Sequence, residues 1–216
     1  MKKLTFLMTG LLVSGLAMAQ PLANHLYLGG SLGFQTEKTT STQGNIKVDY
    51  PKTTQYNFSP AIGYTLTDNW LLGVRAGIGG SKTTDLNPIT NEEIISRTTI
   101  GGAEIFGRYY FNLSERFFFY PDLGIGFASS SSEEEEDGVT ETGPETNIFQ
   151  IGVTPGFAYY PTTHWGIELS VGFVGFTSVT STDERPDPNT ETQTNGFDFV
   201  LNMASVNVGI SYLLML

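Results

Sequence analysis

The sequence predicts an all-β protein: an eight-stranded antiparallel up-and-down transmembrane β-barrel with four long loops at one end and three short turns at the other. Eight stretches alternate apolar residues with small or polar ones at a period of two, which is the pattern of strands with one apolar face. Short and long polar connections alternate strictly between them. All charges inside the strands lie on the other face, so the apolar face is a candidate for contact with lipid.

The N-terminus is expected to be a secretory signal peptide, residues 1–19, followed by the barrel at residues 20–216. Lys2 and Lys3 begin it, a mostly apolar run follows, and residues 17–19 (Ala-Met-Ala) are a typical cleavage site. This pattern predicts export through the general secretory pathway. The alternative is an uncleaved N-terminal anchor, although the apolar run is short for a membrane-spanning helix.

Composition excludes several classes of protein. The sequence has no cysteine, so disulfides and thiolate metal sites are excluded, and we expect no cofactor. Removing Lys2 and Lys3 from the formal charge of −11 leaves −13 for the exported chain, which argues against the basic face that nucleic-acid binding needs. No second apolar stretch of helical span length occurs, but strands cross membranes with a weak hydropathy signal.

The first half of the chain contains four predicted strands. Only residues 67–69 (Thr-Asp-Asn) separate the second from the third, which is the length of a hairpin turn. Residues 35–54 and 80–96 are polar and are expected to form long loops. The four strands are predicted at residues 26–34, 56–66, 70–79 and 98–111.

The second half repeats this rhythm. Residues 112–116 and 160–164 are expected to be short turns, whereas residues 129–146 and 177–194 are expected to be long loops. The four strands are predicted at residues 117–127, 149–159, 165–173 and 204–216. Pro60, Pro121 and Pro155 lie inside strands and cannot donate to a ladder, so we expect β-bulges there, beyond which the facing of side chains can shift by one residue.

The last strand ends the chain on alternating apolar residues, with no turn signal after it. A soluble protein seldom leaves its last strand this way, whereas the last strand of a bacterial outer-membrane barrel closes the barrel and serves as an insertion signal. Such signals usually end in phenylalanine, and this sequence ends in leucine. The predicted C-terminal insertion signal comprises Val208, Ile210, Tyr212, Leu214 and Leu216.

The face opposite the apolar one is expected to line the barrel interior. A soluble lipocalin-like barrel is the alternative, but its exterior would carry lysine and glutamate along the strands, and an eight-stranded interior is too small for the many aromatic residues of the apolar face. A turn that pairs Phe111 with Phe117 would place Arg108 diagonal to Asp122, within reach of its long side chain. The predicted lumen charge network is Arg75, Glu104, Arg108, Asp122 and Glu168.

Aromatic residues gather at the ends of the predicted strands, as they do at the two interfaces of a membrane. For each aromatic residue taken alone, ordinary packing is the alternative. The girdle predicted at the short-turn end comprises Tyr64, Trp70, Tyr109, Phe117, Tyr159, Trp165 and Tyr212. The second girdle is predicted from Phe34, Tyr56, Phe127, Phe149 and Phe173.

Residues 59–64, 67–70 and 108–111 read like hairpins of a known family. The chain resembles the small eight-stranded outer-membrane barrels, namely the OmpA-type transmembrane domain and OmpX-like proteins, of the bacterial outer membrane protein beta-barrel domain family. The resemblance implies a monomeric, multi-pass protein of a Gram-negative cell outer membrane, with extracellular long loops and periplasmic short turns. Its partners would be outer-membrane lipid, lipopolysaccharide, the barrel-assembly machinery and an unknown extracellular partner for the loops.

The candidate chemistry favours a structural or surface-interaction role without catalysis. A salt-bridge plug is the simplest hypothesis for the interior charges, and a passive small-solute conduit, as in OmpW-like porins, is the alternative. Lipid A-modifying enzymes on this fold use histidine and serine, but His25 and His164 both fall at the short-turn end. The acidic run at residues 133–137 is expected to be a solvated loop, with a divalent-cation or basic-partner site as the alternative.

Overall fold

Strands account for all regular secondary structure in the described part of this computed structural model, which covers residues 22–39, 41–43, 46–48, 51–87, 92–183, 190–200 and 206–215. Those residues include no helix long and apolar enough to cross a membrane. The predicted signal peptide and Leu216 lie outside them. The strands are β1 (His25–Lys38), β2 (Ser41–Gln43), β3 (Ile46–Val48), β4 (Lys52–Thr65), β5 (Trp70–Leu86), β6 (Glu93–Tyr109), β7 (Phe111–Asn112), β8 (Phe117–Glu136), β9 (Val139–Thr142), β10 (Glu145–Tyr159), β11 (Trp165–Val171), β12 (Phe173–Asp183), β13 (Thr190–Val200) and β14 (Val206–Met215).

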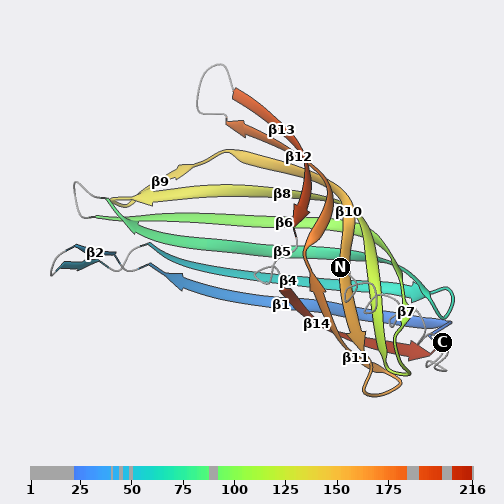
Figure 1. Cartoon of the computed structure of the whole chain (residues 1–216). Helices are drawn as coiled ribbons and strands as arrows, with labels where there is room; N and C mark the ends of the chain where they lie inside the picture. Colours follow the sequence, from blue (N-terminus) through green and yellow to red (C-terminus); the bar gives the residue numbers. More distant parts are fainter. Residues whose placement is uncertain are drawn as a thin grey trace, which may run out of the picture.

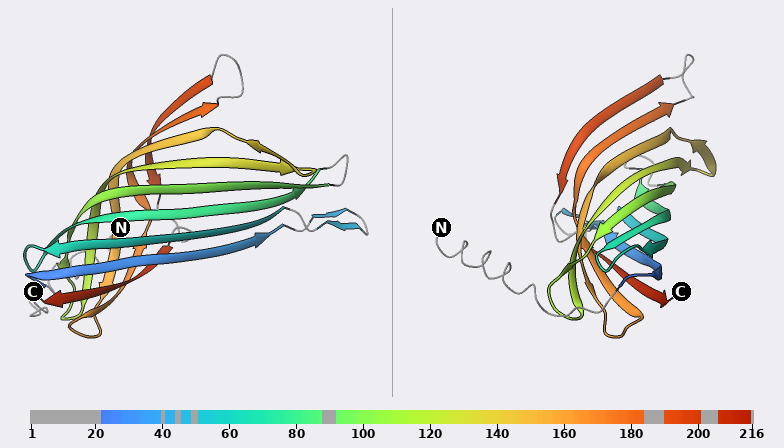
Figure 2. Two further views of the ribbon diagram at one scale, coloured as in Figure 1. Left: turned by 180° about the vertical axis from the view of Figure 1, so that it is seen from behind. Right: turned by 90° about the vertical axis from the view of Figure 1, so that its right-hand side faces the viewer.

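Twelve of these strands form one antiparallel up-and-down sheet, and β2 and β3 pair separately. The pairings run in the order β1–β4–β5–β6–β8–β10–β11–β14. β14 also pairs with β1, so this path returns to its start. Figures 1 and 2 show the resulting curved wall of strands, with β12 and β13 turning away from the others at one end.

The sheet has more strands than the eight predicted, partly because the chain is interrupted at Gly172 between β11 and β12. Gly156 lies opposite Ser170, but Val153 lies opposite Val174, so one extra residue is inserted on the β11–β12 side. Gly172 has φ = 74°, a left-handed conformation that glycine adopts at β-bulges.

This bulge corrects the prediction that Phe173 faces outward with the second aromatic girdle. The inserted residue reverses the alternation of side chains after Gly172. The ring of Phe173 lies against Gly152 and Gly175, so closely that a Cβ atom at either glycine would meet its tip at 2.5 Å and 2.7 Å. Gly152 alternates with the exposed Ile151, so this ring lies on the side of the sheet opposite the apolar surface.

Most of the polar segments predicted to be long loops are strand instead. β8 continues to Glu136, and its ladder with β6 pairs Arg97 with Glu133. β9 lies wholly inside the loop predicted at residues 129–146. β13 begins inside the loop predicted at residues 177–194 and ends before residue 204, where the closing strand was expected to start. The prediction failed because the apolar alternation stops in these segments, whereas a ladder needs only backbone hydrogen bonds and threonine favours strands.

The prediction of bulges at the three prolines is also wrong. β10 and β8 keep one register from Thr146 to Tyr159, and Pro155 lies directly opposite Pro121. On the other edge of β8, the ladder with β6 ends at the pair Arg108 and Asp122 and continues with β7 in the same register. The gap falls at Pro121, which has no N–H to donate. β4 and β5 likewise keep their register on both sides of Pro60.

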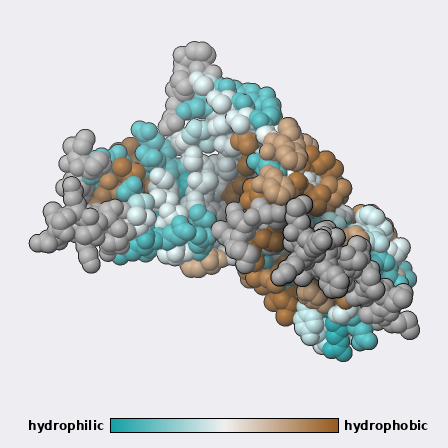
Figure 3. Space-filling view, in the orientation of Figure 1, coloured by the Kyte–Doolittle hydropathy of each residue, from teal (hydrophilic) through white to brown (hydrophobic). Residues whose placement is uncertain are grey.

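The two faces of the sheet differ in burial. The outer face exposes apolar side chains, and four of them lie in one row across four strands: Val74, Ile105, Ile125 and Ile151. Figure 3 shows apolar residues gathered across the middle of the molecule, with hydrophilic residues towards its ends. The inner face holds the buried core, which consists of Leu22, Tyr27, Leu71, Phe106, Tyr110, Phe118, Tyr120, Ala158, Tyr160 and Leu213.

Candidate functional site

Arg108 lies on the inner face near the short-turn end of β6 and contacts two carboxylates. It projects from β6 and is only 3% exposed. Its Nε and Nη2 donate to Oδ2 of Asp122 at 3.0 and 2.8 Å, and its Nη1 donates to Oε2 of Glu168 at 2.8 Å. Asp122 on β8 and Glu168 on β11 are also buried, so each charge depends on protein groups rather than on water.

A second arginine extends this network. Arg75 on β5 pairs with Glu104, which lies directly opposite it on β6, and its Nη2 donates to Oδ2 of Asp122 at 3.0 Å. Nε2 of Gln150 donates to Glu104 at 3.3 Å. The structure therefore brings together all five residues that the sequence suggested for the interior. Two guanidinium groups and three carboxylates leave a formal excess of one negative charge.

One detail of the network differs from the prediction. The turn after β7 sets Phe111 opposite Phe119 rather than Phe117. Arg108 is therefore directly opposite Asp122 instead of diagonal to it. Side chains directly opposite in an antiparallel pair have Cβ atoms about 5 Å apart, and this closeness lets the guanidinium group reach one carboxylate oxygen with two donors.

Aromatic side chains close the space around the two arginines. The Arg108 guanidinium lies 3.9 Å from the centre of the Tyr120 ring, and its Nη1 donates to the hydroxyl of Tyr110 at 3.1 Å. Tyr27 donates to Oε2 of Glu168 at 3.1 Å. The guanidinium of Arg75 lies 4.5 Å from the centre of the Phe106 ring. These contacts combine cation–π attraction with hydrogen bonds to charged groups.

A layer of aromatic rings packed edge to face continues from this network towards the short turns. Tyr110 packs edge-on against Phe118 and Tyr120, and Phe118 packs against Tyr160. Tyr27, Phe106, Phe118 and Tyr160 were not among the predicted site residues. Tyr27, Phe106 and Phe118 lie in strands, at the alternate positions that face the interior, so the alternation of the sequence could have identified them. Tyr160 was assigned to a turn, where alternation gives no information.

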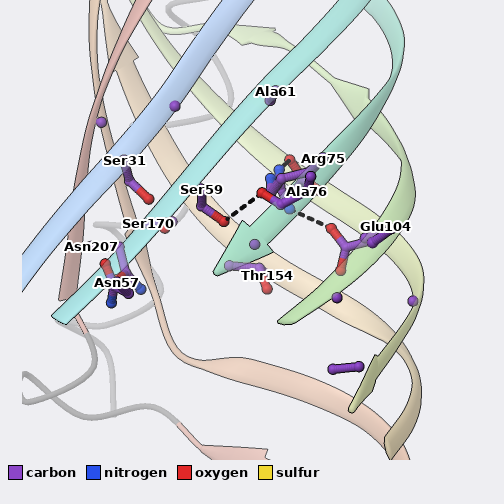
Figure 4. Close-up of a pocket in the computed structure, with 18 of the residues that line it drawn as sticks. Ser31, Asn57, Ser59, Ala61, Arg75, Ala76, Glu104, Thr154, Ser170 and Asn207 are labelled. Carbon is purple, nitrogen blue, oxygen red and sulfur yellow. Dashed lines mark hydrogen bonds and ion pairs between the residues drawn. The ribbon is translucent and has the colours of Figure 1, made fainter. Parts of the chain in front are cut away.

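On the other side of the charges lies a cavity of about 450 Å³. Arg75, Glu104 and Glu168 contribute to its wall, together with small and amide side chains from several strands. Figure 4 shows Arg75 and Glu104 joined at one side of it, with Ser59 directed towards the carbonyl group of Ala76. Other residues labelled there are Ser31, Asn57, Thr154, Ser170 and Asn207.

The predicted aromatic girdle lies at the short-turn end of the outer face. Trp70 packs edge-on against Tyr109 at 5.0 Å between ring centres, and Trp165 packs the same way against Tyr212. Phe117 stacks on Phe157 rather than on another predicted member. Tyr64 and Tyr159 are both exposed.

β14 places the predicted insertion signal between two neighbours. Val208 and Ile210 are exposed on the outer face, as is Leu214. Tyr212 lies opposite Leu28 of β1 and opposite Trp165 of β11. Leu216 lies outside the described residues.

Neither histidine is paired with a serine or a carboxylate by any hydrogen bond of the described residues. Nδ1 of His25 is within 3.0 Å of the carbonyl group of Leu22 and 2.8 Å of that of Ala23. Nδ1 of His164 bonds the hydroxyl of Thr163, and its ring stacks on Tyr212. No group of three or more His, Cys, Asp or Glu residues suited to a metal ion occurs in the part of the chain that the structure describes.

Comparison with known proteins gives a family and a fold. The profile of the outer membrane protein beta-barrel domain matches residues 5–212. No curated protein matches the sequence. Among solved structures, the outer membrane protein OprG from Pseudomonas aeruginosa is similar in fold, with a TM-score of 0.54 and 12% identity over 93% of this chain and 100% of its own.

Two further structures are similar at a lower level. The attachment invasion locus protein Ail of Yersinia pestis has a TM-score of 0.36 and 12% identity, over 88% of this chain and 95% of its own. The transport unit of the autotransporter AIDA-I from Escherichia coli has a TM-score of 0.37 and 12% identity, over 95% of this chain and 94% of its own.

Proposed function

This chain belongs to the outer membrane protein beta-barrel domain family, and from that membership we propose that it crosses the outer membrane as an eight-stranded barrel with a plugged lumen. The circuit of eight pairings supports this proposal, because a closed ladder satisfies backbone groups that lipid cannot. The exposed apolar row across β5, β6, β8 and β10 supports contact with lipid acyl chains. The long hairpins would then be extracellular and the short turns periplasmic.

The proposed role is structural or surface-interacting, and the buried contact between Arg108 and its carboxylate partners is the observation that carries it. Arg108 is 3% exposed and Asp122 is 4% exposed, on the face that would line the inside of such a barrel. The ring layer of Tyr110, Phe118 and Tyr160 lies on the periplasmic side of them. If the lumen is filled in this way, the extracellular hairpins are the part of the protein that would contact other molecules.

Two measurements on the refolded protein test this proposal. An unboiled sample in mild detergent should migrate faster in a gel than a boiled one, because a closed barrel resists unfolding by detergent. In planar bilayers the same preparation should show no steady conductance above baseline. Equal mobility before and after boiling would contradict the barrel, whereas steady conductance in a heat-modifiable sample would contradict only the plug.

A passive conduit for small solutes is the second candidate, because of the cavity of about 450 Å³ beside the charge network. It would require Arg108 to leave Asp122 or Glu168 long enough for a solute to pass. Steady or gated conductance in planar bilayers would favour it over the plugged form.

We propose no catalytic activity for this chain. Among the hydrogen bonds of the described residues, neither His25 nor His164 has a carboxylate partner that would orient its ring as a general base, which supports this proposal. Incubating the protein with lipid A and finding a changed acyl or phosphate content would contradict it.

A further inference from the structure

The charge network ends in a carboxylate at each side. Arg75 bridges Glu104 and Asp122, and Arg108 bridges Asp122 and Glu168, so the five charges form an alternating chain with an acidic group at both ends. Both end groups line the cavity of about 450 Å³. The side chains of Arg75 and Glu104 remain 28% and 18% exposed, whereas those of Arg108 and Asp122 are almost fully buried. The cavity therefore meets an accessible, acidic end of the network and is sealed beyond it.

Each end carboxylate has an oxygen with unused capacity to accept hydrogen bonds. Oε1 of Glu168 is buried and accepts no hydrogen bond from the described residues, and Glu168 as a whole is only 7% exposed. Oε2 of Glu104 accepts from Nε2 of Gln150 at 3.3 Å, which is longer than the usual N–H···O distance. A buried carboxylate oxygen without a donor raises the free energy of the site, so a positively charged donor in the cavity would lower it.

The wall of the cavity supplies no further positive charge. Among the described residues that line it, the cations are Arg75 and Arg108, and both are already paired with carboxylates of the network. Nearer the hairpin tips, alternation places the following cations on the outer face: Lys38, Lys52, Lys82 and Arg97. It places the following carboxylates on the inner face: Glu37, Asp85, Glu134 and Glu136. The approach to the cavity is therefore acidic, which attracts cations.

The remaining wall of the cavity is uncharged and mixes apolar side chains with amides and hydroxyls. The lining residues with an amide or hydroxyl group include Ser31, Asn57, Ser59, Gln150, Ser170 and Asn207. Figure 4 shows Asn57 and Asn207 on the side of the cavity away from Glu104. Amide and hydroxyl groups can both donate to and accept from the hydroxyl groups of a ligand. The site therefore suits a molecule with a cation at one end and neutral hydroxyl groups at the other.

We propose that this cavity binds a small, hydroxylated primary amine. Its ammonium group donates to Glu104, with the free oxygen of Glu168 as a second acceptor, and its hydroxyl groups contact the amides and hydroxyls of the opposite wall. One such cation neutralises the surplus negative charge of the network, and the cavity volume is in the usual range of small-molecule sites. This inference rests on the proposed function, because only a barrel in the outer membrane opens this end of the cavity to molecules outside the cell.

Two other classes of ligand match these features less well. A divalent metal ion takes several oxygen ligands at once, and no group of three or more His, Cys, Asp or Glu residues suited to one occurs in the described part of the chain. A ligand that carries a carboxylate would meet the surplus negative charge, since Arg75 and Arg108 are engaged with Glu104, Asp122 and Glu168. The chemistry of the site therefore favours an organic cation without an acidic group.

Isothermal titration calorimetry of the refolded protein in detergent micelles tests this proposal. The probes are three polyols of equal chain length: glucamine ends in an ammonium group, sorbitol in a hydroxyl and gluconate in a carboxylate. The main variant, Glu104→Gln, removes the charge and keeps the shape of the side chain. Gly77→Val fills part of the cavity without changing a charge, because a Cβ atom at Gly77 meets only the hydroxyl of Ser59, at 3.4 Å. The matched control is Glu115→Gln, which removes an exposed carboxylate from the short turn before β8.

The wild type is expected to bind glucamine at least tenfold more tightly than sorbitol, and to bind gluconate more weakly than sorbitol. Loss of a hydrogen bond to a charged group corresponds to roughly a 10- to 100-fold loss of affinity, so Glu104→Gln should weaken glucamine binding by that factor and leave sorbitol binding within about twofold. Gly77→Val should weaken both ligands, because it takes up the space that they share. Glu115→Gln should stay within about twofold of the wild type, and an equal concentration of potassium ions should not displace glucamine.

Each contrary result overturns the proposal. Equal affinity for glucamine and sorbitol, or equal glucamine binding by the wild type and Glu104→Gln, would exclude a cation site at Glu104. Unchanged glucamine binding by Gly77→Val would place the bound molecule outside the cavity, and displacement by potassium would exclude an organic amine as the specific ligand. Heat-modifiable mobility is recorded for every sample. If it is present, such a result removes only this inference, and if the wild type lacks it, the proposed function fails as well.

Discussion

Arg108 and Asp122 lie directly opposite each other across the ladder between β6 and β8, and two nitrogens of the guanidinium group donate to a single carboxylate oxygen. The same oxygen also accepts from Arg75. Asp122 therefore joins two arginines, and Glu168 holds Arg108 from a third strand. Among the described residues, loss of Arg108 would leave Asp122 one cation but would leave Glu168 with none.

We predict that Arg108→Ala lowers the free energy of unfolding by roughly 3–5 kcal/mol, because it strands a buried carboxylate. Arg108→Ala combined with Glu168→Gln should recover part of this loss. Urea unfolding in lipid vesicles, followed by tryptophan fluorescence, measures the coupling. The control is Arg97→Ala. The side chains of Arg97 and Glu135, which form an ion pair, are 40% and 35% exposed, so loss of this pair should cost about 0–1 kcal/mol. Absence of coupling between Arg108 and Glu168 would refute the buried network.

Gly172→Ala should destabilise the protein by about 1–2 kcal/mol, because a side chain at φ = 74° suffers the left-handed steric penalty. It should also loosen the bulge that turns Phe173 inward. Gly196→Ala on β13 is the matched control, since a Cβ atom there meets nothing within 4 Å, and its change should be within about 0.5 kcal/mol. Equal unfolding midpoints for the two variants would argue against the bulge.

Ile105→Arg is predicted to cost about 2–4 kcal/mol, because this residue is 70% exposed in the middle of the apolar row. The same substitution at Ser131, on the outer face but near the acidic tip of β8, should cost less than 1 kcal/mol. Unfolding in lipid vesicles separates the two. If both variants were equally stable, Ile105 would not be in contact with lipid.

Tyr27→Phe removes only the hydroxyl that donates to Glu168, so it should cost about 1–3 kcal/mol through a buried, charge-assisted hydrogen bond. Tyr64→Phe is the matched control, because its hydroxyl bonds Asn24 at an exposed site and should contribute less than about 0.5 kcal/mol. If Tyr64→Phe lowered the free energy of unfolding as much as Tyr27→Phe, the buried hydrogen bond to Glu168 would contribute no more than an exposed one.

The alternation of side chains was sufficient to predict the all-β fold and the charged residues that meet around Arg108, but not all of the aromatic residues there. It works because the period of a strand is two, so a charge that alternates with apolar residues, such as Arg75 in β5 or Glu104 in β6, lies on the opposite face from them. It could not predict the extent of the ladders, because residues such as Arg97 and Glu133 pair through their backbones without an apolar pattern. Nor did it reveal the bulge at Gly172, since one glycine among many does not mark a positive φ.

The pairing of β1 with β14 has a consequence for how the chain folds. His25 lies opposite Met215, a separation of 215 − 25 = 190 residues, whereas the largest separation in the other pairings of the circuit is 212 − 165 = 47 residues, between Trp165 and Tyr212. Contacts of such long range carry the largest loop-closure entropy and slow folding. Until this last pairing forms, β1 and β14 are unpaired edges that can recruit strands from other chains. Refolding yield should therefore fall as protein concentration rises, even where the folded state itself stays monomeric.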